Sequence, residues 1–167
     1  MKSYNSQTLN GLADDIEIEL SKLAKLEDQV QKIQQNIREA PVYRDSFYES
    51  LALKFHNFYT GCERIFCLIA SDLNGGIPRD GSWHRRLLDR MAVARNQRRA
   101  VISSETASFL DEFLRFRHVV RNIYGFELKL DRLDELIAQY PTVWARFEAE
   151  VSDFVSWLRE LAIALEE

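Results

Sequence analysis

The residues of this sequence that are best suited to chemistry lie within ten positions of one another. They are Arg115, Arg117, His118, Arg121, Asn122 and Tyr124. On a helix, Arg117, Arg121 and Tyr124 share a face, and His118 and Asn122 share an adjacent one. Arginine suits phosphate groups and histidine suits proton transfer near neutral pH. A lone arginine on such a helix is usually a surface salt-bridge partner, but so dense a group is harder to explain in that way.

A second basic group lies between positions 79 and 99. It holds seven arginines against two aspartates, whereas the whole chain has 22 basic and 26 acidic residues and a net charge of -4. The arginines are Arg79, Arg85, Arg86, Arg90, Arg95, Arg98 and Arg99. The segment fits two interpretations equally well, a solvated face paired with acidic neighbours or a phosphate-binding surface. In the second interpretation Arg85 and Arg86 would bind the phosphate together with Arg115 and Arg121.

Length and composition exclude several function classes. The 167 residues are enough for one domain, and no apolar run approaches the roughly 20 residues of a membrane span. The amino terminus lacks the apolar core of a signal peptide, so we expect a cytoplasmic protein. Glycine-rich phosphate loops, dinucleotide fingerprints and HExxH are absent from the sequence. Because Cys62 and Cys67 point to different helix faces, and no histidine has a carboxylate at metal-ligand spacing, we expect neither a metal nor a cofactor.

Long segments of helical periodicity must position these residues. Apolar residues recur every three or four positions in six runs, which cover residues 9–37, 47–73, 82–94, 104–123, 130–140 and 143–165. Pro41 ends the first run, residues 74–78 have loop composition, and Pro141 separates the last two runs. Ser82 and Ser103 or Ser104 are the expected N-caps of the third and fourth helices, and Gly125 is the expected stop of the fourth.

The fold class follows from these runs. No stretch shows the alternation of a strand, and the aromatic residues at helical spacing are typical of a core. The run from Val143 to Leu165 alternates steps of four and three, as in a bundle or coiled-coil seam. We therefore predict a single domain, residues 1–167, that folds as an all-α up-and-down helical bundle of about five to six helices. Residues 1–40 form its long amino-terminal helix and residues 41–167 the remaining bundle.

The fourth run also carries a recognisable pattern, Arg117-x4-Asn122-x-Tyr124. It resembles the Arg-x4-His-x-Tyr signature of the HepT-like toxins, a branch of the HEPN superfamily. The residues around the motif, 115–128, strengthen this resemblance, and residues 56–66 and 83–88 look like helix segments of the same family. The resemblance covers residues 40–160.

The resemblance implies a function. HepT-like toxins are all-α and usually act as homodimeric, metal-independent ribonucleases, encoded beside a MntA-like nucleotidyltransferase antitoxin. It implies an HEPN-like toxin–antitoxin component that binds RNA and forms a homodimer or higher homo-oligomer. RNA cleavage needs a base, an acid and a fixed cation, and Arg117 would be the cation. Positions 117 and 122 lie about 140° apart on an ideal helix, which favours a cleft between two copies of the fourth helix.

The chain departs from the family at the histidine position, which is Asn122 here. Asparagine can orient a phosphate or a water but cannot exchange protons near neutral pH. Whether the protein is an enzyme thus stays open. His118, one turn before Asn122, could supply the proton-transfer group, or the site could be a degenerate HEPN module that binds RNA, nucleotide or a partner protein without cleavage. An engineered origin of Asn122 is a further alternative.

Tyr124 stands at the tyrosine that the family's antitoxin modifies with AMP. Such a modification would place bulk and negative charge beside Arg117 and Arg121 and block the RNA. The alternative is a helix-end tyrosine that only packs its ring. A third interpretation of the whole chain is a plain helical adaptor, in which the arginines form salt bridges and the carboxyl-terminal seam serves packing or dimerisation.

Overall fold

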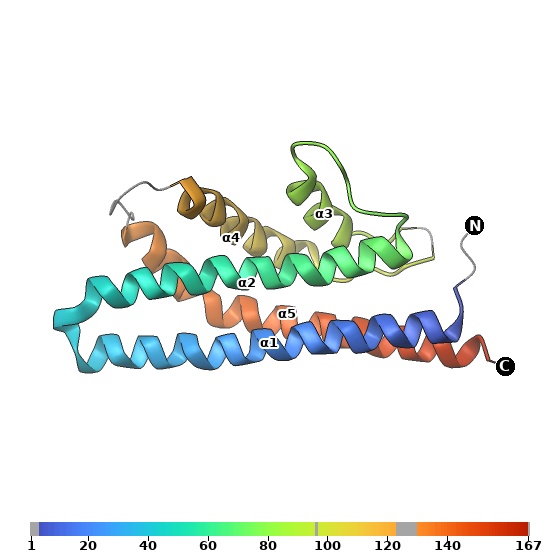
Figure 1. Ribbon diagram of the computed structural model, residues 1–167, viewed down its shortest axis with the longest axis horizontal. Helices are drawn as coiled ribbons and strands as arrows, with labels where there is room; N and C mark the ends of the chain where they lie inside the picture. The colour runs from blue at the N-terminus through green and yellow to red at the C-terminus, as the bar shows by residue number, and fades with distance from the viewer. Residues whose placement is uncertain (1–3, 96, 123–129, 167) are drawn as a thin grey trace.

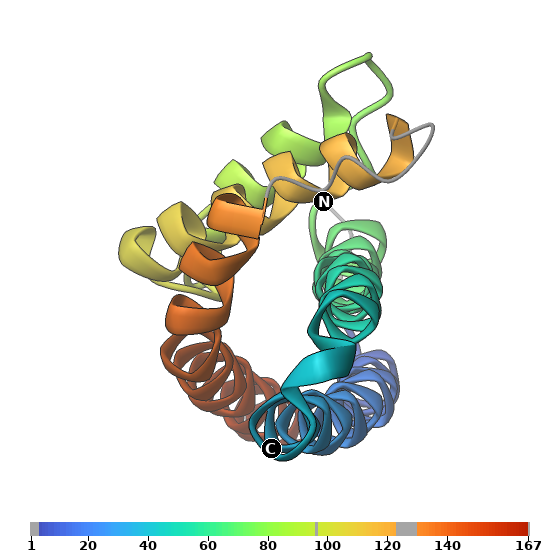
Figure 2. The same ribbon diagram turned by 90° about the vertical axis from the view of Figure 1, so that its left-hand side faces the viewer.

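The computed structural model describes residues 4–95, 97–122 and 130–166, apart from the side chains of residues 122, 130 and 131. Three long helices, α1 (Ser6–Glu39), α2 (Arg44–Leu73) and α5 (Leu130–Ala164), run along the length of the molecule. The shorter α3 (Trp83–Met91) and α4 (Ser104–Asn122) complete an all-α bundle, as the sequence predicts (Figure 1). Seen along its length, the bundle has α1 at one edge and α3 with α4 at the opposite edge (Figure 2).

The first two helices form an antiparallel hairpin. Asn5 caps α1 by accepting a hydrogen bond from the backbone N–H of Thr8 at 2.7 Å. After the helix ends at Glu39, Pro41 opens a short 3-10 turn, Pro41–Tyr43, that leads into α2. The expected bounds of both helices are therefore confirmed to within three residues. Differences of about this size are common at helix ends, which fray.

A glycine sets how closely this hairpin packs. A Cβ atom at Gly61 of α2 would lie 2.5 Å from Cδ2 of Leu23 on α1. The buried Leu23 side chain fills the space beside Gly61, so a larger residue at position 61 would overlap it.

The last helix corrects a sequence expectation. Pro141 lies inside a continuous α5 rather than between two helices. The buried apolar stripe runs in phase through it, with Leu136 and Tyr140 before the proline and Val143 and Phe147 after it. Burial of this stripe outweighs the roughly 3 kcal/mol that a proline costs inside a helix. The seam beyond it is used within the chain: it is buried as far as Leu158, whereas Leu165 is exposed.

The two short helices start at the expected serines, with differences in detail. Ser103 caps α4 by accepting from the N–H of Thr106 at 3.1 Å. Ser82 precedes α3, but its hydroxyl lies 3.2 Å from the Asp80 carboxylate and caps nothing. The expected stop at Gly125 lies outside the described residues.

Helix α3 ends at Met91, three residues earlier than expected. The guanidinium of Arg98 donates to the carbonyl oxygens of Arg90 at 2.8 Å and Val93 at 3.2 Å. It also donates to the side chain of Asn74 at 2.9 Å. Because Arg98 is buried and satisfied in this way, it is a structural residue and not part of a basic surface.

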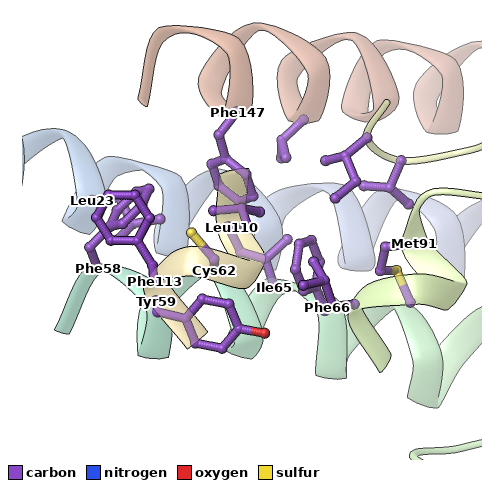
Figure 3. Close-up of a cluster of buried hydrophobic side chains, with 14 of the residues drawn as sticks. Leu23, Phe58, Tyr59, Cys62, Ile65, Phe66, Met91, Leu110, Phe113 and Phe147 are labelled. Atoms are coloured by element: carbon purple, nitrogen blue, oxygen red, sulfur yellow. The ribbon is translucent and has the colours of Figure 1, made fainter. Parts of the chain in front are cut away.

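An aromatic core joins α2, α4 and α5. Phe58 of α2 lies 5.3 Å from Phe113 of α4, and 5.1 Å from Tyr140 and 6.3 Å from Phe147 of α5, each with its ring near perpendicular. Figure 3 shows Phe113 and Phe147 meeting Phe58 and the fully buried Cys62, with Tyr59 at the border of the cluster. The aromatic residues at helical spacing are thus core, as predicted, and they fix α4 against α2.

Candidate functional site

The motif arginine is buried where α4 crosses α2. Arg117 is 3% exposed, whereas His118 and Arg121 on the same helix are exposed. Its Nη1 donates to Oε1 of Glu63 at 3.1 Å, and its Nη2 to Oε2 at 3.3 Å. Glu63 is buried as well. A two-point ion pair of this kind fixes the plane of the guanidinium as well as its position.

A histidine from α3 completes the group. Nδ1 of His84 lies 2.7 Å from Oε2 of Glu63 and 2.9 Å from Nη2 of Arg117. The imidazole ring also stacks on Trp83, with 3.6 Å between ring centroids. Three separate helices thus bring a carboxylate, a guanidinium and an imidazole into mutual contact, and we call Glu63, His84 and Arg117 the polar triad.

Two further α2 residues line this group. The Arg117 guanidinium lies over the Tyr59 ring, 4.9 Å from its centroid. Burial raises the pKa of the Tyr59 hydroxyl, and the Glu63 carboxylate adds to this rise. Burial lowers the pKa of His56, and the positive charges of Arg117 and Arg121 lower it further, so this imidazole is neutral at pH 7.

Several polar atoms here lack partners. Nε of Arg117, the Tyr59 hydroxyl and Nδ1 of His56 are buried without a hydrogen bond among the described residues. Buried groups of this kind are rare in folded proteins and tend to mark functional positions. The structure therefore shows a preorganised polar centre with unused hydrogen-bonding capacity.

The other candidate residues come from the carboxyl-terminal half of the fourth run. His118 and Arg121 are exposed, and the His118 ring lies 6.1 Å from that of His84, nearly perpendicular to it. Asn122 is the last residue of α4, and nothing is described of its side chain. Tyr124 lies outside the described residues, so its proposed modification stays a prediction.

The predicted phosphate ligands are paired with carboxylates. Arg85 and Arg115 both contact Asp111, each at 2.9 Å, and Arg86 contacts Asp80. All three arginines are exposed. Such a salt-bridged surface is one of the two interpretations that the sequence allows for the basic segment. A phosphate would have to compete with these carboxylates for the arginines.

Glu63, His84 and His56 are the residues that the motif does not point to. His56, Tyr59 and Glu63 recur at steps of three and four, which places them on one face of α2. That spacing is present in the sequence, but without the crossing of α2 and α4 it cannot be told from an ordinary polar stripe.

Glu63 also borders a cavity between α1 and α2. The cavity has a volume of about 370 Å³, and Glu19, Arg64 and Cys67 are among its lining residues. Burial raises the pKa of the Cys67 thiol to about 11. The thiol is therefore protonated at neutral pH and is a poor nucleophile.

Comparison with known families places these residues in context. A model of the family described as HepT-like protein matches residues 50–158, which include every described residue of the site. The curated proteins and the solved structures give no match. Within the part of the chain that is described, no helix is long and apolar enough to cross a membrane. Because the family model spans well over half of the 167 residues and the fold is the all-α bundle the family predicts, this chain belongs to the HepT-like family of HEPN proteins.

Proposed function

We propose that this protein is the ribonuclease toxin of a toxin–antitoxin system. It cleaves RNA without a metal at a cleft between two copies of the chain, acts in the cytoplasm, and is neutralised by a MntA-like nucleotidyltransferase. The observation that carries this proposal is the contact of Arg117 with His84 and Glu63, since it joins the motif arginine to an acid–base group in one preorganised centre.

The chemistry of metal-free RNA cleavage explains why these residue types meet. The 2′-hydroxyl attacks the neighbouring phosphorus, the bond from phosphorus to the 5′ oxygen breaks, and a 2′,3′-cyclic phosphate and a 5′-hydroxyl result. A base must accept the 2′ proton, an acid must protonate the 5′ oxygen, and a cation must stabilise the extra charge on the phosphorane. Arg117 is the cation in this proposal, and its buried Nε forms no hydrogen bond with the described residues.

The geometry of α4 supports the dimer in this proposal. His118 and Arg121 lie on its exposed side, whereas Arg117 is buried against α2. One phosphate cannot contact both the buried and the exposed side of the same helix. A second copy of the chain would therefore have to supply the groups of one side. Two α4 helices facing each other would allow this, with Arg121 and Asn122 of one copy opposite the polar triad of the other.

Two observations favour a second candidate function, a degenerate module that binds RNA or nucleotide without cleaving it. Asn122 cannot transfer protons, and the guanidinium of Arg117 is already engaged by Glu63 on both of its terminal nitrogens. In such a module the triad would hold the bundle together, and Arg121 with the exposed arginines of α3 would contact phosphate.

The experiment that separates the two functions is cleavage of end-labelled RNA in EDTA. Replacing Arg117 alone would leave Glu63 buried without its counter-ion, so the informative variant is the neutral pair Glu63→Gln with Arg117→Gln, checked by circular dichroism. Arg159→Ala is the control, because Arg159 forms exposed ion pairs with Asp14 and Glu17 far along the chain from the site. A ribonuclease loses cleavage in the paired variant and keeps it in the control, whereas a binding module cleaves in neither and retains RNA binding.

A further inference from the structure

We propose that His84 is the proton-transfer residue of this chain, in place of the motif histidine that Asn122 replaces, and that Glu63 is its positioning residue. This inference rests on the proposed ribonuclease function and names the group that performs its acid–base step. It starts from the contact of a third helix, α3, with the motif arginine, at a position that the motif itself does not include.

The placement of His84 is that of an oriented acid–base group. Its Nδ1 lies 2.7 Å from a buried carboxylate oxygen, and its ring is held by stacking on Trp83. A carboxylate at one ring nitrogen fixes the tautomer, orients the ring and stabilises the imidazolium that forms during proton transfer. Glu63 thereby leaves Nε2 as the atom that can meet the substrate.

The position of Nε2 supports this role. Among the described residues none forms a hydrogen bond with Nε2, and the His84 side chain is 18% exposed. One nitrogen is thus anchored inside the protein, while the other has no competing partner in the described structure. His118 lies at a distance of 6.1 Å between ring centroids, close enough to join the same cleft but on the exposed surface of α4.

The two contacts of Nδ1 define two states of the ring. When Nδ1 carries a proton it donates to Glu63, and Nε2 is then a free acceptor that can serve as a base. When Nδ1 has no proton it accepts from Nη2 of Arg117, and Nε2–H is then a donor. The 2.7 Å contact with the Glu63 carboxylate favours the first state, because an unprotonated Nδ1 would leave two acceptor atoms facing each other.

The proton balance of the step is complete. Nε2 of His84 accepts the 2′-hydroxyl proton while the 2′ oxygen bonds to phosphorus and the bond from phosphorus to the 5′ oxygen breaks. The departing 5′ oxygen takes a proton from water, and the imidazolium returns one to the solvent. The Glu63 carboxylate contacts both Arg117 and His84, so it can compensate the charge of the imidazolium.

The test compares His84→Asn with the rival variant His118→Asn and with the control Arg159→Ala in single-turnover RNA cleavage with EDTA. The amide nitrogen of asparagine at position 84 can still donate to Glu63, so the variant removes proton transfer while keeping the anchor. Binding of an uncleavable 2′-O-methyl RNA is measured in parallel. We expect His84→Asn to lose about 10² to 10⁴-fold in cleavage rate with binding changed less than about threefold. Arg159→Ala, whose ion pairs with Asp14 and Glu17 are exposed, should cleave within about threefold of the unaltered chain.

Two readouts separate proton transfer from a structural effect. Added imidazole should restore part of the cleavage by His84→Ala, and the acidic limb of the pH–rate profile should disappear in His84→Asn. Normal cleavage by His84→Asn, or loss in His118→Asn alone, would overturn the inference while leaving the ribonuclease proposal intact. If only Asn122→His cleaves, His84 does not replace the motif histidine; if no form cleaves, the ribonuclease proposal fails and this inference with it.

Discussion

The Glu63 carboxylate holds the Arg117 guanidinium at both of its terminal nitrogens, across the contact between α2 and α4. Both side chains are buried, so each charge depends on the other for its stability in the folded protein. The same contact fixes the orientation of the motif arginine and occupies the two terminal nitrogens that a phosphate would bind. The pair therefore stabilises the fold and also orients the cation of the proposed reaction.

Breaking the pair on one side should be costly. We expect Glu63→Ala or Arg117→Ala to lower the free energy of unfolding by about 3–5 kcal/mol, because either change leaves a buried charge without a partner. The double variant Glu63→Leu with Arg117→Met should be closer in stability to the original than either single change. Urea unfolding of all four proteins measures this, and additive losses would contradict the coupling.

The glycine at the α1–α2 contact gives a second stability prediction. Gly61→Ala should destabilise the protein by about 1–3 kcal/mol, because the new methyl group overlaps Leu23. Gly11→Ala is the matched control, since nothing lies within 4 Å of its added Cβ and α1 should gain about 0.5–1 kcal/mol. Thermal unfolding distinguishes the two, and equal shifts of the same sign would show that the hairpin does not pack so closely.

The proline inside α5 gives a third stability prediction. Pro141→Ala restores a backbone donor at an exposed position of a continuous helix, so we expect the free energy of unfolding to rise by about 1–3 kcal/mol. The helix content seen by circular dichroism should change little. A loss of stability would mean that the backbone geometry that Pro141 imposes on α5 is needed to pack the aromatic core.

The thiol of Cys67 yields a prediction on pH. Because its pKa is raised to about 11, the reactive thiolate is scarce at neutral pH and increases as the pH rises toward 11. The rate of alkylation should climb about tenfold for each pH unit between 8 and 10, followed by mass spectrometry in a Cys62→Ser background. A plateau near pH 8.5, the value of a free thiol, would show that the folded protein does not bury this group.

Much of the fold can be predicted from the sequence because helical periodicity is a local signal. The runs that become α1 and α2 are uninterrupted, and their ends coincide with Pro41 and with Asn74. Pro141 misleads for the same reason: its local preference is to break a helix, whereas the buried stripe on both sides is a tertiary effect that only packing reveals.

The site is only half visible in the sequence. Arg117 is found through its motif, but its partners Glu63 and His84 come from segments 54 and 33 positions away. No local pattern links residues at such separations, because their contact depends on how α2, α3 and α4 cross. The exposed arginines show the converse: a basic count cannot reveal that Arg85 and Arg115 share the single carboxylate of Asp111.

Metal-independent RNA cleavage is tested by incubating the unaltered protein with end-labelled RNA in EDTA and analysing the ends of the products. We expect fragments that carry 2′,3′-cyclic phosphate and 5′-hydroxyl ends, formed without any divalent metal. Intact RNA after complete single-turnover incubation, with the RNA still bound, would contradict the ribonuclease function and leave a binding module on the HEPN scaffold.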